Sequence, residues 1–186
     1  NDDVGDHSVV LSAIDIGGAF AVQSFVITVE NTAEAGVFTA HDITTSANGA
    51  NSVYAVDVDG DGDMDVLAAI FSNSIPDDKI VWYENNGNQG FTEHEISSSA
   101  RWHNSVYAAD VDGDGDMDVL SATQQHPSIV WYENDGSENF TEHAISNSEY
   151  GWGAYSVHTA DVDGDGDIDV LSGTGGVLSG GGDEIS

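Results

Sequence analysis

The sequence lacks cysteine altogether and is nearly without basic residues. Because there is no cysteine, disulfide bonds and thiol redox chemistry are excluded. Lys79 and Arg101 are the only lysine and arginine, against 34 acidic residues, and the formal net charge at pH 7 is -32. A surface this acidic argues against binding to nucleic acid or to an anionic membrane.

Long apolar runs are also missing. The stretch 19–29 is interrupted by Gln23 and Ser24 and falls short of the roughly 18 residues that a membrane span needs, so no membrane insertion is expected. The sequence begins at Asn1 without Met or a signal peptide, which fits a processed chain or a fragment. We expect an exported protein, secreted or at the cell surface, in a salty medium that screens its charge.

What the sequence does contain is one acidic stretch repeated three times, at 57–65, 110–118 and 161–169. Each copy has aspartate at positions 1, 3, 5, 7 and 9 and glycine at positions 4 and 6. Neighbouring carboxylates at this spacing repel by about 3 kcal/mol per pair, and nothing basic lies nearby in sequence. A hard cation that takes oxygen ligands removes this repulsion, and calcium fits best.

Each position of the acidic loop has an expected role. The aspartates at positions 1, 3 and 5 supply side-chain oxygens as ligands, and the glycine at position 6 allows a tight turn. The backbone carbonyl at position 7 would be a further ligand, and the aspartate at position 9 would complete the coordination shell with both of its oxygens. A helix–loop–helix calcium site would need Glu at position 12, where this chain has Ala68, Ser121 and Ser172. A β-type run follows each loop, so the loop joins two strands. The candidate ligands of three Ca²⁺ sites are Asp57, Asp59, Asp61, Asp63, Asp65, Asp110, Asp112, Asp114, Asp116, Asp118, Asp161, Asp163, Asp165, Asp167 and Asp169.

The repeat extends well beyond the loops. The first aspartates of successive loops are 53 and 51 residues apart, which is the period of a propeller blade or a similar β unit. A Ser-Val-Tyr-Ala run precedes the loop, and Ile-Val-Trp-Tyr, a turn and Phe-Thr-x-His-x-Ile follow it. This order predicts a meander of four short strands. Because Ile-Val-Trp-Tyr is apolar on both faces, we expect each sheet to be covered on both sides by its neighbours.

The predicted fold is therefore all-β, with four-stranded antiparallel meanders arranged as propeller-like blades in an incomplete ring of about three and a half units. One repeat domain contains a degenerate unit at 1–51, blades at 52–104 and 105–155, and a partial blade at 156–186. In the first unit, Val10-Leu11-Ser12-Ala13 matches 119–122, and we expect a lost or weak calcium site before it. The last unit reaches Ile185, where its third strand begins.

The loop pattern Asp-x-Asp-x-Asp-Gly-x-x-Asp, followed by Val-Leu and spaced by about fifty residues, resembles the FG-GAP and VCBS repeat proteins, which include the calcium-loop blades of integrin alpha chains. Val53-Tyr54 stands where Phe-Gly is usual, and Ser121-Ala122-Thr123 stands where Gly-Ala-Pro is usual. These departures resemble the bacterial secreted branch. The resemblance implies calcium-stabilised propellers in adhesion, in surface structures and in accessory modules of secreted carbohydrate-active enzymes.

Two function classes stay open. The first is a non-enzymatic extracellular protein, structural or adhesive, whose calcium ions rigidify the blades. Its incomplete end units leave three alternatives: a piece of a longer propeller, a ring closed by several copies, or a head-to-tail filament that associates through open β-edges.

The second class is a sugar-binding module of a secreted carbohydrate-active enzyme. Trp102 and Trp152 lie in loops between repeats, where an exposed indole can stack on a sugar ring, or alternatively plug the central channel or a seam between blades. His41, His94 and His143 recur at one repeat position, which favours repeat packing over catalysis or zinc binding. Since we find no nucleophile–base constellation, we do not expect an enzyme.

Overall fold

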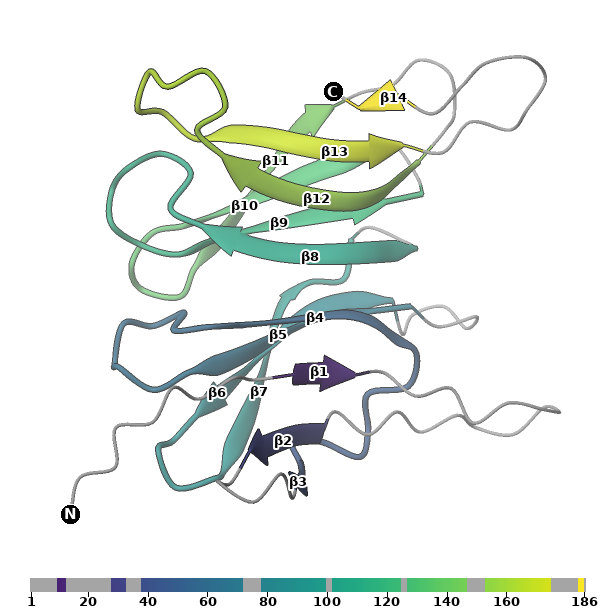
Figure 1. The fold of residues 1–186 in the computed structure, drawn as a ribbon, viewed down its shortest axis with the longest axis vertical. Coiled ribbons are helices and arrows are strands. Elements are labelled where there is room, and N and C mark those ends of the chain that lie inside the picture. The colour runs from purple at the N-terminus through teal and green to yellow at the C-terminus, as the bar shows by residue number, and fades with distance from the viewer. Residues whose placement is uncertain are drawn as a thin grey trace, which may run out of the picture.

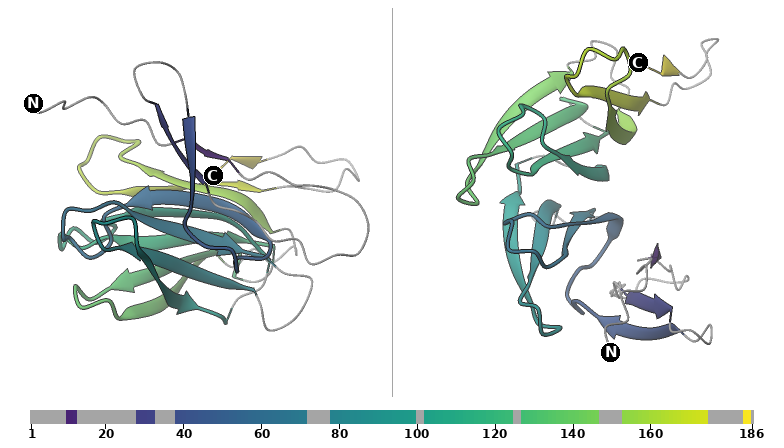
Figure 2. Two further views of the ribbon diagram at one scale, coloured as in Figure 1. Left: turned by 90° about the horizontal axis from the view of Figure 1, so that it is seen from below. Right: turned by 60° about the vertical axis from the view of Figure 1, so that its left-hand side comes forward.

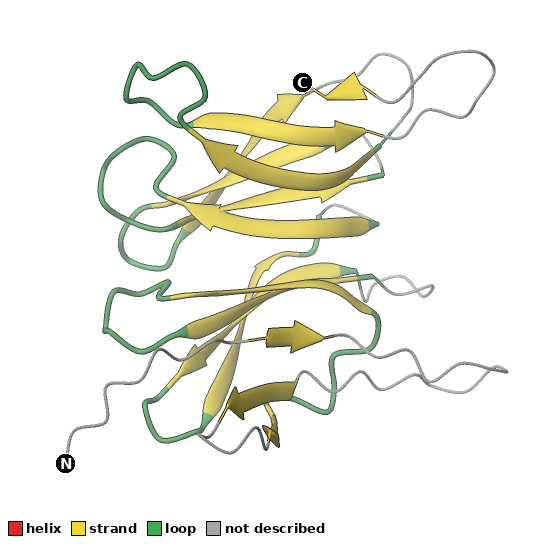
Figure 3. Cartoon of the chain, viewed as in Figure 1, coloured by secondary structure: helices red, strands yellow, loops and turns green. Residues whose placement is uncertain are grey.

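The structure is a computed structural model that describes residues 10–12, 28–32, 38–71, 78–99, 102–124, 127–146, 153–174 and 184–185. All regular secondary structure in these residues is β, as predicted (Figure 3). No helix in the described part of the chain is long and apolar enough to cross a membrane.

The strands form four antiparallel sheets, shown in Figure 1. In each sheet the strands lie side by side in chain order, which confirms the predicted meander. The N-terminal sheet has β1 (Val10–Ser12), β2 (Thr28–Thr32) and β3 (Phe38–Asp42); blade 1 has β4 (Ala50–Val56), β5 (Asp65–Ile70), β6 (Lys79–Asn85) and β7 (Phe91–Ser97); blade 2 has β8 (His103–Ala109), β9 (Asp118–Thr123), β10 (Ile129–Asn134) and β11 (Phe140–Ser146); and the C-terminal sheet has β12 (Ala154–Ala160), β13 (Asp169–Thr174) and β14 (Glu184–Ile185).

The third strand of blade 1 shows why its sequence is apolar without alternation. Ile80 and Trp82 pack in the core that blade 1 shares with blade 2, whereas Val81 and Tyr83 pack in a second core with Ala47. All four side chains are at most 2% exposed. Burying one such side chain stabilises the fold by about 1.5–3 kcal/mol, so both faces of the sheet hold the molecule together, as the sequence predicts.

The sheets follow one another along an open arc (Figure 2). The first strands of successive sheets, β4, β8 and β12, lie on the concave side, and the fourth strands β7 and β11 lie on the convex side. The rings of Tyr54 and Tyr107 are 4.6 Å apart, and those of Tyr107 and His158 are 4.2 Å apart. These contacts link the first strands into one aromatic row along the arc.

Polar contacts repeat at the same seams. The side-chain amide of Asn51 donates to the carbonyl of His103 at 3.2 Å, and that of Asn104 donates to the carbonyl of Ala154 at 2.8 Å. The two asparagines occupy equivalent positions in β4 and β8. Each therefore fastens its own first strand to the first strand of the following sheet.

The exposure of the valine at position 2 of each acidic loop depends on whether a further sheet packs on it. Val58, at position 2 of the first loop, is 3% exposed because blade 2 packs on it. Val111, its equivalent in the second loop, packs against the core shared with the C-terminal sheet. Val162, the third equivalent, is 65% exposed. The same residue type thus passes from core to surface along the arc.

The two end sheets are incomplete blades, and their strands are the ones that the sequence predicts. β1 pairs with β2, which matches the pairing of second and third strands in the full blades. In the C-terminal sheet, Ile185 pairs with Gly173 as Ile80 pairs with Ala69, so Ile185 does enter a third strand. The weak site expected at the start of the chain lies outside the described residues.

Candidate metal centres in three acidic loops

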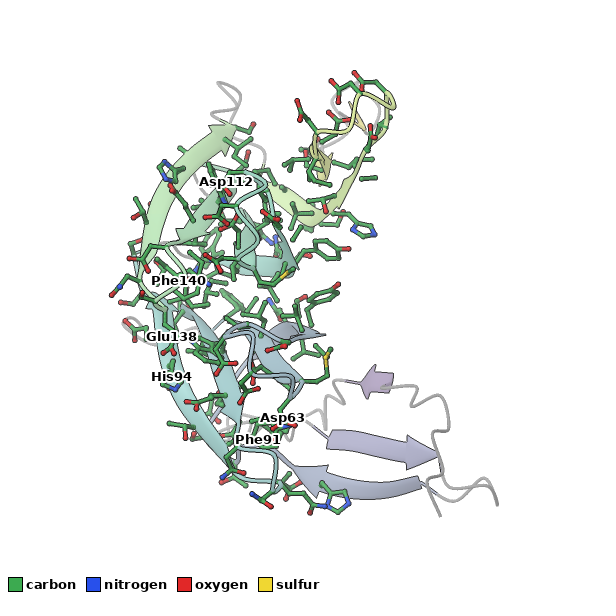
Figure 4. All side chains as sticks on the ribbon, turned by 90° about the vertical axis from the view of Figure 1, so that its left-hand side faces the viewer. Asp63, Phe91, His94, Asp112, Glu138 and Phe140 are labelled. Atoms are coloured by element: carbon green, nitrogen blue, oxygen red, sulfur yellow. The ribbon has the colours of Figure 1, made fainter. Side chains whose placement is uncertain are left out.

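The three acidic loops occupy equivalent places in the fold. Each joins the first strand of its sheet to the second, at 57–64, 110–117 and 161–168, and all three lie at one end of the molecule (left in Figure 1). No helix follows any of them, which confirms that each loop joins two strands. Figure 4 looks onto this end, where Asp63 and Asp112 are labelled.

The first aspartate of each loop organises the turn. In the first loop, Asp57 accepts hydrogen bonds from the backbone N–H of Gly60 at 2.9 Å and of Gly62 at 3.0 Å, one on each oxygen. The two glycines have φ values of 75° and 97°, a region where a side chain would be strained. Asp110 and Asp161 make the same pair of bonds in their own loops, at 2.8 and 3.1 Å and at 2.7 and 3.1 Å.

The aspartates at positions 3 and 5 continue the curl. Asp59 accepts from the N–H of Asp61 at 3.1 Å, and Asp61 accepts from the N–H of Asp63 at 2.8 Å. Equivalent bonds recur in the other two loops. Each of these carboxylates uses one oxygen on the backbone, so its second oxygen remains available to a cation.

The aspartate at position 9 is buried in the first two loops, whereas Asp169 of the third loop is not. Asp65 is fully buried and accepts from the N–H of Val58 at 2.9 Å and from the N–H of Asn85 at 2.8 Å. Asp118 is also fully buried and makes the equivalent bonds to Val111 and Asn134 at 3.0 and 2.8 Å. This carboxylate therefore ties the start of its loop to the third strand.

Burial has an electrostatic consequence at position 9. It raises the pKa of Asp65 and of Asp118 above the usual range of a carboxyl group, and the backbone N–H donors oppose this rise only in part. Both oxygens of each carboxylate already accept one hydrogen bond, and each keeps a second lone pair. A cation beside these oxygens would favour the charged form, which burial disfavours.

Three carboxylates of each loop bring oxygens within 4.8 Å of one another, and each group can hold a metal ion. The triads are Asp57, Asp59 and Asp61; Asp110, Asp112 and Asp118; and Asp161, Asp163 and Asp169. The other predicted ligands, outside these triads, are Asp63, Asp65, Asp114, Asp116, Asp165 and Asp167. The donors are all oxygens, which is the donor set that hard cations take.

The aspartate at position 7 has its side chain against a neighbouring turn. A Cβ atom on Gly87, where φ is 70°, would lie 2.5 Å from the Oδ2 atom of Asp63. Gly136 stands in the same relation to Asp116. The side chain of position 7 therefore lies beside the turn that follows the third strand.

Sequence reasoning missed the part played by Asn85 and Asn134. Besides its backbone bond to the buried aspartate, Asn85 donates from its side chain to the carbonyl of Met64 at 3.0 Å, and Asn134 donates to Met117 at 3.2 Å. The signal was the recurrence of Glu-Asn directly after Trp-Tyr in both complete blades. A polar residue fixed at the end of a buried strand indicates a specific partner.

Two of the three recurrent histidines, His94 and His143, pack as expected, whereas His41 is exposed. His94 stacks on Trp82 with ring centroids 4.6 Å apart and bonds Glu84 at 2.7 Å. His143 lies 4.7 Å from the ring of Trp131 and bonds its own glutamate, Glu133. Each histidine thus covers the tryptophan of the neighbouring strand.

The candidate sugar-binding residues lie at the other end of the blades or outside the described residues. Trp102, between β7 and β8, is 44% exposed and has a φ of 61°. Its N–H donates to Asp78 at 3.2 Å, and its carbonyl accepts from the N–H of Gln124 at 3.1 Å. Trp152 lies outside the described residues.

A family model described as FG-GAP-like repeat matches residues 69–121 and 110–172. The chain belongs to this family. Together the two FG-GAP-like matches run from β5 to β13 and include the second and third acidic loops. A search of curated proteins returned no match.

Proposed function

We propose that this FG-GAP-like chain is a non-enzymatic extracellular calcium-binding protein with a structural or adhesive role. The observation that carries the proposal is that each of three equivalent loops brings oxygens of three carboxylates within 4.8 Å of one another. FG-GAP repeats are typical of extracellular proteins. The departures at Val53-Tyr54 and at 121–123 favour the VCBS-like bacterial secreted branch within this group.

Calcium suits the loops better than other common cations. Calcium accepts about six to eight oxygen ligands in flexible geometry, whereas magnesium needs a near-ideal octahedron and keeps several waters. The aspartates at positions 1, 3, 5 and 9 and the carbonyl of position 7 would hold the ion in each loop. Bound there, calcium would neutralise carboxylates that otherwise repel one another and would stiffen the connection between the first two strands.

The same proposal includes self-association through the incomplete end units. Val162 and Tyr155 of the C-terminal sheet are 65% and 57% exposed. In blade 1, the equivalent of Val162 is covered by the next sheet. A sheet from a second copy would cover these side chains in the same way, and repetition of such a heterologous contact gives a ring or a filament.

Light scattering tests the assembly. In millimolar calcium the chain is expected to form particles larger than a monomer, and excess chelator is expected to disperse them, because loops without calcium no longer hold the sheets in register. Replacing Val162 by Glu should reduce particle size in calcium while calcium still binds. A compact monomer in calcium at every protein concentration would contradict self-association and leave calcium binding to be judged on its own.

One observation favours a second candidate function, a carbohydrate-binding module of a secreted carbohydrate-active enzyme. Trp102 combines an exposed indole with a left-handed backbone, which is rare for a bulky residue and persists where surrounding contacts impose it. Phe71 meets its ring edge-on at a centroid distance of 6.4 Å. The indole is thus exposed beside Phe71, and its flat apolar face would serve as a platform for a sugar ring.

Glycan binding measured on an array, and then by calorimetry, tests this second function. Replacing Trp102 by Ala is expected to abolish binding, because it removes the flat apolar face on which the C–H surface of a sugar ring would pack. Replacing Trp102 by Phe keeps an aromatic face and should retain most of the affinity. Equal binding by the wild-type and Trp102→Ala proteins would reject the sugar platform.

A further inference from the structure

A groove of about 420 Å³ lies between the acidic loops of blades 1 and 2. Blade 1 contributes the end of β4 and the first part of its loop, and blade 2 contributes the end of its loop and the turn after β10. Figure 4 shows this end of the molecule, with Glu138 labelled on the turn of blade 2. The groove therefore exists only where the two blades meet, since neither blade forms it alone.

The groove is lined by apolar and by acidic side chains. Val56, Met64 and Met117 supply apolar surface, together with a small part of Val58, which is 3% exposed; Met64 is 51% exposed. Exposed methionines are adaptable surfaces that accept varied aliphatic groups. Water therefore covers apolar side chains here that a bound aliphatic group could cover instead.

The acidic residues of the lining are Asp57, Asp59, Asp116 and Glu138, and no basic side chain lines the groove among the described residues. Lys79 is paired with Glu93, and Arg101 lies outside the described residues. Calcium in the loops would take up charge from Asp57 and Asp59. Glu138 belongs to the turn and would keep its charge, so the groove stays acidic with calcium bound.

We propose that this groove binds a lysine or arginine side chain on an extended segment of a partner protein. The aliphatic stem of such a side chain would cover the two methionines while its charged end meets the carboxylates, the usual arrangement of a long basic residue at a mixed surface. The acidic loops gathered at this end would steer a basic segment towards the groove. This inference concerns a partner and goes beyond calcium binding.

The chain offers a selective probe, because its two methionines both line the groove. With ¹³C-labelled methionine methyl groups, NMR gives one signal for Met64 and one for Met117. We would titrate the calcium-saturated protein with the acetylated amide of Leu-Lys-Leu and, as a control peptide, with the form in which norleucine replaces lysine. The lysine peptide is expected to shift both signals saturably, and the norleucine peptide is not.

Two variants with the same change of charge test the contact itself. Glu138→Gln is expected to weaken the lysine peptide roughly three- to fivefold, as for loss of a partly exposed ion pair. Glu95→Gln changes an exposed carboxylate on β7 that does not line the groove, and should leave the affinity unchanged. The inference is overturned if the lysine peptide leaves both methyl signals in place, if norleucine binds equally well, or if the two variants weaken binding equally. A separate calcium titration of each variant keeps this outcome distinct from failure of the calcium sites.

Discussion

Excess chelator is expected to lower the melting temperature of the calcium-loaded protein by roughly 15–30 °C, or to unfold it at room temperature. An ion present at 100 times its dissociation constant stabilises the folded state by about 2.7 kcal/mol, and three such ions approach the whole stability of an ordinary domain. A chain of this size shifts its melting temperature by about 2–4 °C for each kcal/mol. The expected loss follows from carboxylates held within 4.8 Å of one another in every loop.

Salt and magnesium controls separate specific binding from screening. The net charge of -32 means that any salt stabilises the folded chain to some degree. Sodium chloride at matched ionic strength should therefore recover a small part of the lost stability, and magnesium somewhat more. Calcium should recover all of it at millimolar concentration. A melting temperature that is the same in calcium and in excess chelator would contradict the calcium sites.

Replacing Asp118 by Ala is expected to destabilise the chain with calcium and also without it. The fully buried carboxylate accepts from the N–H groups of Val111 and Asn134, and its loss leaves both donors without this acceptor. Leaving buried donors unsatisfied costs about 1–3 kcal/mol each, so we expect a loss of about 2–5 kcal/mol before any effect on calcium. Urea denaturation, in calcium and in chelator, measures both parts.

Asp112 is the matched control for this experiment. It belongs to the same oxygen triad but is exposed, and its bond to the N–H of Asp114 is local to the loop. Asp112→Ala should therefore weaken the protein in calcium and have little effect in chelator. Sodium sulfate, which favours compact states, can keep the chelated proteins folded for the comparison. If Asp118→Ala costs nothing in chelator, the buried aspartate does not tie the loop to the third strand.

Much of this architecture could be predicted because the same sequence pattern occurs in each repeat unit. The apolar runs 80–83 and 129–132 predicted third strands covered on both faces, and the structure places them so. Short matches at Val10 and Ile185 were enough to assign incomplete end blades, since strand register in one unit constrains the next. A single short apolar run does not decide its own secondary structure, whereas the same run at the same position in several units indicates a strand.

The sequence predicted which residues make up the candidate site, but it did not predict the contacts that these residues make with other strands. Nothing in the five alternating aspartates predicts which of them is buried, yet Asp65 is fully buried while Asp61 is exposed. The difference arises because Asp65 meets the N–H of Asn85, twenty residues away, when the third strand folds back. The groove at Glu138 depends on two blades meeting. Contacts between residues so far apart in the chain depend on tertiary packing and produce no recognisable pattern in the local sequence.

The equivalent valines of the three loops become more exposed along the arc, and this has a consequence for the cooperativity of unfolding. Val58, Val111 and Val162 show that each sheet is stabilised by its immediate neighbours, so the free energy of unfolding is a sum of unit and interface terms, as in a one-dimensional chain of coupled units. Amide hydrogens in β5 and β9, which have neighbours on both sides, would then exchange slowest. Those of β13 would exchange sooner, and local opening would spread inward from the uncovered face.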